Sequence, residues 1–390
     1  MLQYELKLDS TFVKDWIENF QVKSNIFSKN KELNIVDIYS GCGGMTLGAL
    51  AASVHNKTNF NIELAIDFNK ESHNVYLQNF QEYSTRIIND DIKNLFDKRR
   101  KNYQPTINHS RVDILFAGPP CQGHSDLNNS TRRNDDRNQL YHYSIKAIET
   151  YSPEIVIIEN VAGVIHSKEK VVQKTKCFLK KNDYYLKEMT INFQSLGIPQ
   201  KRERHILIAS KNESFINSII ESKRLTRVQL YDFIVEYEDQ ESTENLLLKP
   251  TKVSKDNRNR IDYLFKEELY DLPNHMRPSC HRDKEHSYKS CYGRLRYNEA
   301  SQTITSGFGS MGQGRYVHPT KKRTILAIEA ARIQGFPKSF SFENVQTMTS
   351  LRKMIANAVP PQLTYFIADK YLKLKEKQKE QRAVTSCMTS

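Results

Sequence analysis

The stretch Gly118-Pro119-Pro120-Cys121-Gln122 directly follows the apolar run Ile114-Leu115-Phe116-Ala117. A short apolar run bounded by turn residues is typical of a buried strand. The two prolines prevent a direct transition into a helix, because proline lacks a backbone N–H and restrains the residue before it. We therefore expect a stiff, extended loop after this strand, with Cys121 at its base.

Two other apolar runs also end in residues that can do chemistry. Ile155-Val156-Ile157-Ile158 leads into Glu159-Asn160-Val161, and Ile35-Val36-Asp37-Ile38-Tyr39 leads into Ser40-Gly41-Cys42-Gly43-Gly44. The carboxyl ends of parallel strands meet at one edge of an open α/β sheet, which is where such sheets bind their ligands. The sequence therefore predicts an α/β fold with an active site at that edge.

The composition is typical of a water-soluble protein. Hydrophobic residues make up 38% of the 390 residues, and the mean hydropathy is −0.65. No run approaches the roughly 18 apolar residues of a membrane helix. The N-terminus lacks a basic region followed by an apolar one, so we expect no secretory signal and a cytoplasmic location. Six cysteines without a Cys-x-x-Cys pair do not indicate a disulfide framework.

The net charge of +13, from 58 basic and 45 acidic residues, indicates a polyanionic partner. Solubility would explain the charge equally well, but the placement of the basic residues favours a nucleic acid. Three clusters lie near the expected loops: Arg132, Arg133 and Arg137; Lys201, Arg202 and Arg204; and Lys321, Lys322 and Arg323. Such clusters suit contacts with phosphate groups.

Short apolar strands alternate with polar helical stretches between 33 and 208, which indicates βαβ units and a parallel sheet. The expected strands are 35–39, 63–66, 86–88, 113–117, 155–158 and 204–209. Before them, apolar residues at helical spacing follow Asp9-Ser10, so we expect a helix capped there. Trp16 lies in that helix and is interpreted as a packing residue.

The alternation fades after residue 208, where apolar residues such as Phe215, Leu230 and Phe233 could build the modest core of a separate domain. Helical patterns return near 325–334, before Gly335, and over 361–380. We therefore predict a catalytic domain formed by 1–208 and completed by 322–390, with a small domain over 209–321.

The segment Gly41-Cys42-Gly43-Gly44 lies between a strand and a helix, as in nucleotide-binding turns. Glycine lets the backbone approach a ligand, and the helix N-terminus offers unpaired N–H groups. The spacing is not Gly-x-Gly-x-x-Gly, which disfavours a dinucleotide and an NAD-dependent dehydrogenase. Asp67 could bind ribose hydroxyls, and Asp91-Ile92 could bracket an adenine ring. The pattern favours an adenosine ligand without a diphosphate, such as S-adenosylmethionine.

Cys121 and Glu159 are the candidate reacting groups. A catalytic cysteine acts as a thiolate, which needs an electropositive and partly exposed setting. A plain buried cysteine is the simplest alternative, but the stiff Pro-Pro loop with arginines nearby favours a nucleophile. A carboxyl group at the end of the second strand can hold a proton for a ring nitrogen or donate one to it.

Together these motifs resemble the DNA cytosine-5 methyltransferases of prokaryotic restriction–modification systems. In the order of the family, the matching segments are the cofactor-binding motif (37–44), the catalytic loop (119–125), the Glu-Asn-Val motif (159–161), the Gln-x-Arg-x-Arg motif (200–204), the ninth motif (294–305) followed by 329–337, and the last motif (357–361). A chance match would produce one motif, not seven segments in the order of the family across 35–361.

The resemblance implies a Rossmann-like S-adenosylmethionine-dependent methyltransferase sheet with a second, smaller target-recognition domain. It implies that Cys121 attacks C6 of a cytosine flipped out of double-stranded DNA, and that C5 then takes the methyl group. Glu159 would contact N3 and the exocyclic amine, while Arg202 and Arg204 would hold the base and the backbone.

The resemblance also assigns binding residues. Those implied for the cofactor are Tyr39, Gly41, Gly43, Gly44, Asp67, Asp91, Ile92, Pro119, Asn357 and Val359. Those implied for DNA, on the loop over the flipped base, are Gln122, Ser125, Arg132, Arg133 and Arg137. Three positions depart from the usual pattern: His124 replaces phenylalanine, Asp67 replaces glutamate, and Ala356 replaces glycine.

Sequence readout is expected between 209 and 293, because the family varies there. Arginine can read guanine in the major groove. Candidate readers are Arg258, Arg260, Arg277 and Arg282, each of which could equally contact phosphate. Cys280, His281, His286 and Cys291 invite a zinc hypothesis, but without a Cys-x-x-Cys pair the spacing is weak and no metal is predicted.

Two alternatives stay open at this point. One is cytosine-5 methylation of RNA, although the long variable region favours DNA. The other is a binding protein that has lost catalysis, against which the presence of Cys121, Glu159, Arg202 and Arg204 argues. We further expect a monomer that associates with the nucleoid when bound to DNA, with a cognate restriction endonuclease acting separately.

Overall fold

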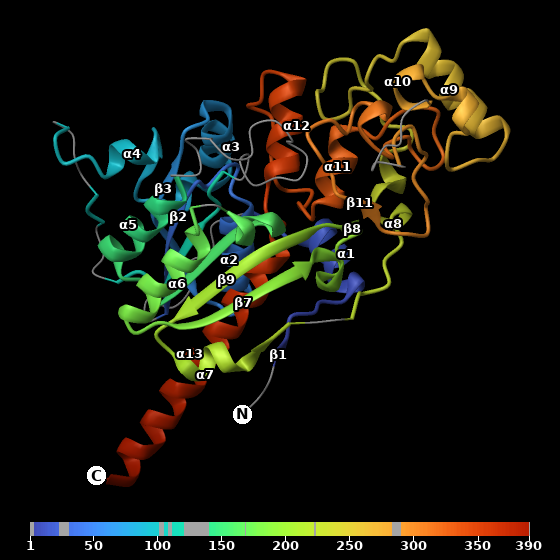
Figure 1. Ribbon diagram of the computed structural model, residues 1–390. Helices are drawn as coiled ribbons and strands as arrows, with labels where there is room; N and C mark the ends of the chain where they lie inside the picture. The colour runs from blue at the N-terminus through green and yellow to red at the C-terminus, as the bar shows by residue number, and fades with distance from the viewer. Residues whose placement is uncertain are drawn as a thin grey trace.

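The computed structural model describes residues 4–22, 31–100, 105–107, 111–120, 140–167, 169–221, 224–282 and 290–389, with side chains to residue 381. Within these residues a seven-stranded sheet forms the centre of the larger part of the molecule (Figure 1). Across the sheet, the strands are β4 (Ile87–Asn89), β3 (Asn59–Asp67), β2 (Glu32–Ile38), β5 (Ile114–Ala117), β6 (Ile155–Val161), β9 (Glu203–Ser210) and β7 (Tyr185–Asn192).

Strands β4, β3, β2, β5 and β6 are parallel, whereas β9 and β7 run antiparallel to their neighbours. The carboxyl ends of β2, β3, β5 and β6 therefore share one edge of the sheet. Because β9 is antiparallel to β6, its first residues reach the same edge, and Arg204 lies opposite Val161. The α/β fold is confirmed, but the expectation of a wholly parallel sheet is wrong, and β7 was not expected.

Helices cover both faces of this sheet (Figure 1). The helices are α1 (Ser10–Asn19), α2 (Gly44–His55), α3 (Lys70–Phe80), α4 (Ile92–Leu95), α5 (Tyr141–Tyr151), α6 (Val171–Lys181), α7 (Glu213–Ser218), α8 (Tyr231–Ile234), α9 (Lys255–Lys266), α10 (Ser279–Arg282), α11 (Ala327–Ile333), α12 (Met348–Asn357) and α13 (Gln362–Thr389). Apolar residues of α4, α5 and α6 pack on one face, while those of α1, α2, α7 and α13 pack on the other. Among the described helices, none is both long and apolar enough to cross a membrane.

The N-terminal helix forms as its sequence predicts. The Asp9 side chain accepts a hydrogen bond from the backbone N–H of Thr11 at the start of α1. Trp16 is buried, and its indole N–H donates to the carbonyl of Gly335 at 3.1 Å, next to the end of α11. The expected packing role of Trp16 is confirmed, and it joins the two ends of the chain.

A smaller unit with its own apolar core lies beside the sheet, around α9 and α10 (Figure 1). Its buried residues are Ile261, Leu264, Leu272, Cys291, Tyr292, Met311 and Val317. Two short parallel strands, β8 (Gln200–Lys201) and β11 (Ser301–Gln302), join it to the larger part.

The expectation that Phe215, Leu230 and Phe233 belong to the small core is wrong. These side chains pack in the core that includes Leu6 and Val13 of the N-terminal region. The reason is a second short pairing, in which β1 (Tyr4–Glu5) runs parallel to β10 (Ile219–Ile220). The proposed boundaries of the two domains stay a prediction.

Helix α2 lies unusually close to the segment before α13. A Cβ atom at Gly48 would lie 2.0 Å from the carbonyl oxygen of Pro361 and 2.2 Å from Oγ1 of Thr364. At Gly44 it would lie 2.2 Å from the carbonyl oxygen of Val359. The two glycines are therefore required by backbone contact rather than by a turn.

We predict that Gly48→Ala destabilises the protein. Helix propensity favours alanine by about 1 kcal/mol, but the new methyl group would overlap backbone, and such overpacking costs about 1–3 kcal/mol. We expect a net loss of about 1–2 kcal/mol in urea unfolding. Gly118→Ala is the matched control, because its Cβ would meet the flexible end of Met45 at 3.4 Å. A gain in stability for Gly48→Ala would contradict the close contact.

Candidate active site

The turn after β2 is built from residues in left-handed backbone conformations. Tyr39, Gly41 and Gly43 have φ values of 60°, 54° and 92°. The N–H of Gly43 donates to the carbonyl of Ser40 at 2.9 Å, and α2 begins directly afterwards. A Cβ at Gly41 would meet no atom within 4 Å, so the turn has open space on that side. This turn can therefore take a ligand against its backbone.

Asp67 holds this turn from the end of β3. Its Oδ2 accepts from the N–H of Gly41 and its Oδ1 from that of Asn69, both at 2.8 Å. Burial raises the pKa of Asp67, while these two N–H groups oppose the rise. Since a carboxylate oxygen can accept more than one hydrogen bond, Asp67 can still receive a ligand hydroxyl.

The other residues expected at the cofactor turn lie around it. The side chain of Asp91 caps α4 by accepting from the N–H of Lys93 at 2.9 Å, and Ile92 is buried behind it. Asp91 is close enough to Tyr39 for its charge to help raise the pKa of that phenol. Gly44 contacts Val359, as described above, and Asn357 is exposed at the end of α12. Their assignment to cofactor binding stays a prediction.

Phe68 is an aromatic residue at this edge that the sequence analysis missed. It directly follows Asp67, and 78% of its surface is exposed. An exposed aromatic ring can stack on a planar ligand group, and this one stands beside the cofactor turn. The sequence could have indicated Phe68 by its position, because it comes one residue after the carboxylate that ends β3.

The strand before Cys121 reaches the same edge. The N–H of Gly118 donates to the carbonyl of Ile38 at 3.4 Å, which places β5 beside the cofactor turn. The side-chain amide of Asn160 donates to the carbonyl of Pro119 at 3.1 Å. Cys121, Gln122, Ser125, Arg132, Arg133 and Arg137, which were expected on the following loop, lie outside the described residues. Their roles stay predictions.

Glu159 and Arg204 lie together at the end of β6. Nε of Arg204 is 3.1 Å from Oε1 of Glu159, and both side chains are mostly buried. Despite this distance, Oε1 makes no aligned hydrogen bond within the described part of the chain. Arg204 uses one guanidinium N–H on the carbonyl of Glu203 at 2.7 Å. The pair therefore presents a carboxylate with spare accepting capacity beside a cation.

Arg202, which was expected with Arg204 to hold the base and the backbone, lies in the interior, and its role in binding stays a prediction. Its exposed fraction is 2%. Its guanidinium donates to the carbonyls of Ala356 at 2.9 Å and Ala358 at 3.3 Å. In a continuous strand, residues two apart point to the same side, so the spacing of Arg202 and Arg204 suggests a shared direction. Arg202, however, lies between β8 and β9 and is not part of β9, so this alternation does not apply to it.

Two buried glutamines continue the contacts of Arg202. Nε2 of Gln200 donates to Oε1 of Gln334 at 2.7 Å, and Nε2 of Gln334 donates to the carbonyl of Ile355 at 2.7 Å. Oε1 of Gln200 accepts from the N–H of Ile304 at 2.8 Å. These amides join the segment after β11, α11 and the end of α12, and the sequence analysis did not anticipate them.

The comparisons with known proteins agree with this geometry. Residues 33–373 match the model of the C-5 cytosine-specific DNA methylases. The chain belongs to the C-5 cytosine-specific DNA methylase family. It is 37% identical to the type II methyltransferase M1.BsuMI of Bacillus subtilis, over 93% of this chain and 85% of that protein. It is 27% identical to the type II methylase M.HgiDII of Herpetosiphon aurantiacus, over 86% and 93%.

A solved structure shares the fold of this methylase. S. pombe Dnmt2 methyltransferase aligns with a TM-score of 0.58 and 18% sequence identity, over 88% of this chain and 99% of that one. The predicted DNA cytosine-5 methyltransferase family and the Rossmann-like methyltransferase sheet are thus confirmed.

In the basic cluster Lys321, Lys322 and Arg323, each side chain forms an ion pair within the methylase. Nζ of Lys321 lies 2.7 Å from Asp239, and Nζ of Lys322 lies 3.0 Å from Asp262. Arg323 is buried and donates to both carboxylate oxygens of Glu329, at 2.8 and 2.9 Å. Burial raises the pKa of Glu329, but hydrogen bonds and charge from His318 and Arg323 outweigh it and lower that pKa overall. The expectation that this cluster contacts phosphate is wrong for Arg323.

The candidate base readers of the methylase also contact its own backbone. Arg258 donates to the carbonyl of Lys322 at 2.6 Å, Arg260 to that of Met276 at 3.0 Å, and Arg277 to that of Leu272 at 3.0 Å. These contacts favour structural roles over base readout. The described residues contain no group of three or more potential metal ligands, and His286 lies outside them.

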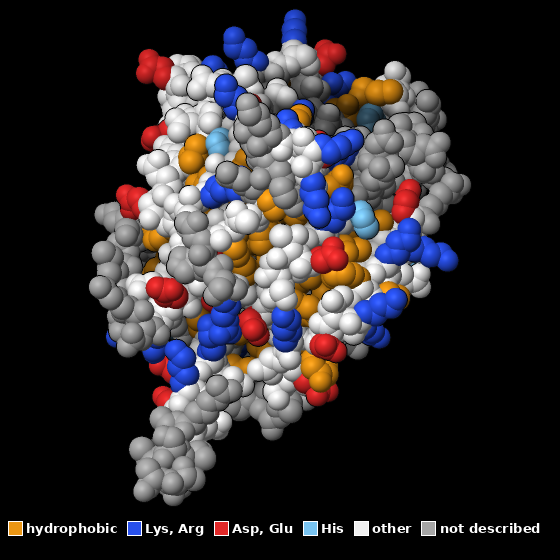
Figure 2. Space-filling model, turned by 90° about the vertical axis from the view of Figure 1, so that its left-hand side faces the viewer, with side chains coloured by type: hydrophobic (Ala, Val, Ile, Leu, Met, Phe, Trp, Pro, Cys, Tyr) orange, Lys and Arg blue, Asp and Glu red, His pale blue; other side chains and the backbone are white. Residues whose placement is uncertain are grey.

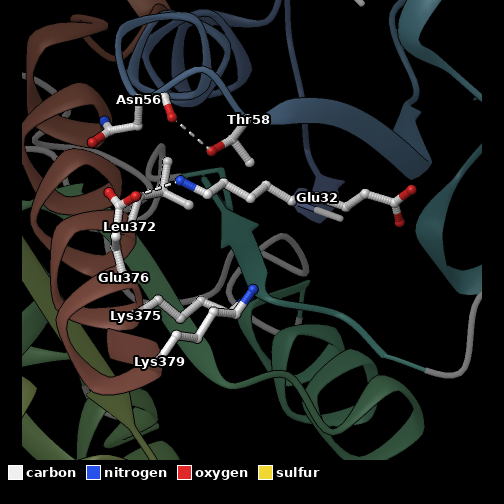
Figure 3. A pocket seen from close by; sticks show the side chains of 8 residues that line it. Glu32, Asn56, Thr58, Leu372, Lys375, Glu376 and Lys379 are labelled. Carbon is white, nitrogen blue, oxygen red and sulfur yellow. Dashed lines mark hydrogen bonds and ion pairs between the residues drawn. The ribbon is translucent and has the colours of Figure 1, made fainter. Parts of the chain in front are cut away.

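Charges are mixed on the face of the methylase that carries α4, α5 and α6. Figure 2 shows Lys and Arg side chains spread over this face with Asp and Glu side chains among them. A hollow at the opposite edge of the sheet is lined by Lys31, Glu32, Asn56, Thr58, Leu372, Lys375, Glu376 and Lys379 (Figure 3). Two of these residues, Lys31 and Glu376, form an ion pair. Since Glu32 starts β2, the hollow is remote from the candidate site.

The cysteine of the cofactor turn is unsuited to attack. Cys42 is buried, and burial raises the pKa of its thiol to about 12. A thiol with that pKa stays protonated near neutral pH, and the thiolate is the nucleophile. Cys42 is therefore a poor nucleophile, and the role of Cys121 as the nucleophile stays a prediction.

Asp37 is a buried carboxyl group beneath the cofactor turn. Its Oδ2 accepts from the hydroxyl of Thr46 at 2.6 Å, whereas Oδ1 is buried without a hydrogen bond from any described residue. Burial raises the pKa of Asp37 to about 7, the hydroxyl of Thr46 lowers it, and the charge of Asp67 raises it further. The folded protein therefore favours the protonated form of Asp37.

We predict that Asp37 lowers the stability of the protein as the pH rises from about 4 to about 7. In the unfolded chain an aspartate ionises at a pKa of about 4, whereas in the folded chain its pKa is about 7. The contribution of Asp37 is therefore fully present below the unfolded pKa and is lost as the pH rises through 7. Asp37→Asn should gain a few kcal/mol relative to the wild type between pH 5 and 8, measured by urea unfolding. A difference that stays constant with pH would contradict the raised pKa.

Proposed function

We propose that this protein transfers a methyl group from S-adenosylmethionine to C5 of a flipped-out cytosine in a short specific sequence of double-stranded DNA. The observation that carries the proposal is the meeting of three elements at one sheet edge. These are the turn at Gly41, the strand that leads into Pro119, and the carboxylate of Glu159. Chemistry between an adenosine cofactor and a second substrate needs both partners at one place.

The chain's own groups divide the work on the base. The thiolate of Cys121 forms a bond to C6, and the electron pair of the C5–C6 double bond moves toward C5. Glu159 stabilises this electron-rich ring by donating a proton at N3 and by accepting a hydrogen bond from the exocyclic amine, for which its Oε1 has spare accepting capacity. After C5 is methylated, a base removes the C5 proton, and the C–H electron pair re-forms the double bond and expels the thiolate.

Arg204 and Arg202 have different parts in this proposal. The guanidinium of Arg204 keeps the Glu159 carboxylate in place and can donate to the base beside it. Arg202 is a positioning residue, because its contacts are the carbonyls of Ala356 and Ala358 rather than the open edge.

The residues around the turn fit the proposed cofactor. Asp67 can accept the ribose hydroxyls, and the exposed ring of Phe68 can stack on the adenine. The set that the resemblance implies is completed by Tyr39, Gly41, Gly43, Gly44, Asp91, Ile92, Pro119, Asn357 and Val359. S-adenosylmethionine, when bound, supplies the activated methyl group on its sulfonium. The backbone at Gly41 leaves the room that such a ligand needs.

The flipped base and the sequence readout follow from the substrate. C6 of a stacked cytosine is out of reach of an enzyme side chain, so the base must leave the duplex. We assign the readout to the small domain over 209–321, and the phosphate contacts to Gln122, Ser125, Arg132, Arg133 and Arg137. We further propose a cytoplasmic monomer that is nucleoid-associated on DNA and protects it from a separate cognate endonuclease.

The function is tested with labelled S-adenosylmethionine, unmethylated genomic DNA and total RNA, followed by sequencing of the modified cytosines. We expect label in DNA at one short recurring sequence. Cys121→Ala should lower the transfer by at least about 1,000-fold and leave DNA binding intact, because flipping and backbone contacts do not need the thiol. Label in RNA instead of DNA would favour the alternative substrate, and full activity of Cys121→Ala would exclude the nucleophile.

Glu159 can be tested by a matched pair of substitutions on one strand. Glu159→Gln should reduce the transfer rate by about 10²–10⁴-fold, the usual contribution of a positioned acid or base, with little change in DNA affinity. Glu154→Gln makes the same chemical change just before the other end of β6. It should retain nearly full activity. Equal losses in both variants would indicate a structural effect rather than a catalytic one.

A further inference from the structure

The buried side chain of Gln334 joins two segments that lie far apart in the sequence. Its Oε1 accepts from Nε2 of Gln200 at 2.7 Å. Its Nε2 donates to the carbonyl of Ile355 at 2.7 Å and to that of Ala356 at 3.3 Å. Gln334 is fully buried and belongs to the motif 329–337, but no step of the proposed mechanism uses this motif.

The first joined segment leads to the carboxylate proposed for the target base. Gln200 begins β8, and the same short segment ends at Arg204, whose Nε is 3.1 Å from Oε1 of Glu159. The chain between them is fixed by backbone hydrogen bonds. The N–H of Arg202 donates to the carbonyl of Gln200 at 3.0 Å, and the carbonyl of Arg202 accepts from the N–H of Phe193 at 2.8 Å. The position of Gln200 therefore helps to set the position of the Arg204–Glu159 pair.

The second joined segment leads to the cofactor turn. The carbonyl of Ala356, to which Gln334 donates, also accepts from the guanidinium of Arg202 at 2.9 Å. The chain then reaches Val359, whose carbonyl oxygen would lie 2.2 Å from a Cβ atom at Gly44. Gly44 is the first residue of α2 and directly follows the turn. The end of α12 is thus packed against the backbone that is proposed to hold the cofactor.

The primary amide of Gln334 suits this position, because it offers an acceptor and two donors in a fixed geometry. Methionine has a similar length but neither function. In the interior, each partner left without its hydrogen bond is costly, so the amide favours one arrangement of the two segments over displaced ones. Every residue that makes this connection lies in the described part of the chain.

We propose that Gln334 is a positioning residue that holds the target-base carboxylate in a fixed place relative to the cofactor turn. This inference rests on the proposed function. Gln334 is buried away from both ligands, so it acts through Gln200 and the end of α12. Methyl transfer requires the base and the methyl group in one arrangement, and an error of about 1 Å can cost about 100-fold in rate. Loss of the amide should slow transfer and leave each binding site able to bind its own ligand.

The test is Gln334→Met. We measure the dissociation constants of S-adenosylmethionine and of unmethylated genomic DNA separately, and then the single-turnover rate of methyl transfer at saturating concentrations of both. We expect a rate at least about tenfold lower, with each dissociation constant within about threefold of the wild type. A general loss of structure would weaken binding as well, so the separation of rate from affinity identifies a positioning role.

Gln200→Met breaks the same link from the other side, and it decides the question if Gln334→Met does not fold. It should also slow transfer at least about tenfold. The double variant should be within about threefold of Gln200→Met, because residues that act through one contact are not additive. Losses that multiply in the double variant would show that the two glutamines act independently and would overturn the inference.

Gln362→Met is the matched control. Gln362 is also fully buried, and its Nε2 donates to the carbonyl of Gly335 at 3.0 Å, next to Gln334. Among the described residues, its amide makes no hydrogen bond to 200–204 or to 355–359. This control should keep the transfer rate within about twofold. A Gln334→Met rate within twofold of the wild type would overturn the inference, as would equal losses of rate in Gln334→Met and Gln362→Met. Wild-type protein that transfers no methyl group would overturn the proposed function, and this inference with it.

Discussion

The carbonyl groups at the end of α12 are the buried constraint on which the site depends. The last carbonyls of a helix have no partner within the helix, and a buried one must find a donor elsewhere. Gln334 donates to Ile355, and Arg202 donates to Ala356 and Ala358. A cation at the C-terminal end of a helix is also electrostatically favourable. These contacts fix the chain just before Val359 reaches the cofactor turn.

The same cluster explains how distant parts of the chain form one site. Gln200 joins Gln334 to Ile304, so the ninth motif, α11 and the last motif share one set of buried hydrogen bonds. Such networks specify one arrangement, because a donor or acceptor left without a partner is costly in the interior. Gln200, Arg202 and Gln334, which belong to the motifs but are not reacting groups, therefore hold the parts of the site together. Gly44 and Gly48 then allow α2 to approach that assembly closely.

Sequence reasoning identified the elements whose local signal is strong and missed those set by tertiary contacts. Long apolar runs marked the central strands, whereas β7 is an edge strand with an exposed Tyr185 and a weak pattern. The burial of Arg202 could not be read from its motif, because its acceptors lie 154 and 156 residues away. The sequence likewise suggested a phosphate contact for Arg323, because its ion pair with Glu241, 82 residues away, depends on the fold. Arg323 also pairs with Glu329.

The proposed mechanism requires Cys121 to attack the target base beside the edge where Gly41, Pro119 and Glu159 meet. The most direct measurement is to incubate the protein with S-adenosylmethionine and DNA in which 5-fluorocytosine replaces cytosine, then to map the cross-linked peptide by mass spectrometry. Fluorine at C5 cannot leave as a proton does, so the adduct should persist. We predict a stable adduct on Cys121. An adduct on Cys177 or Cys280, or none despite active methylation of normal DNA, would contradict it.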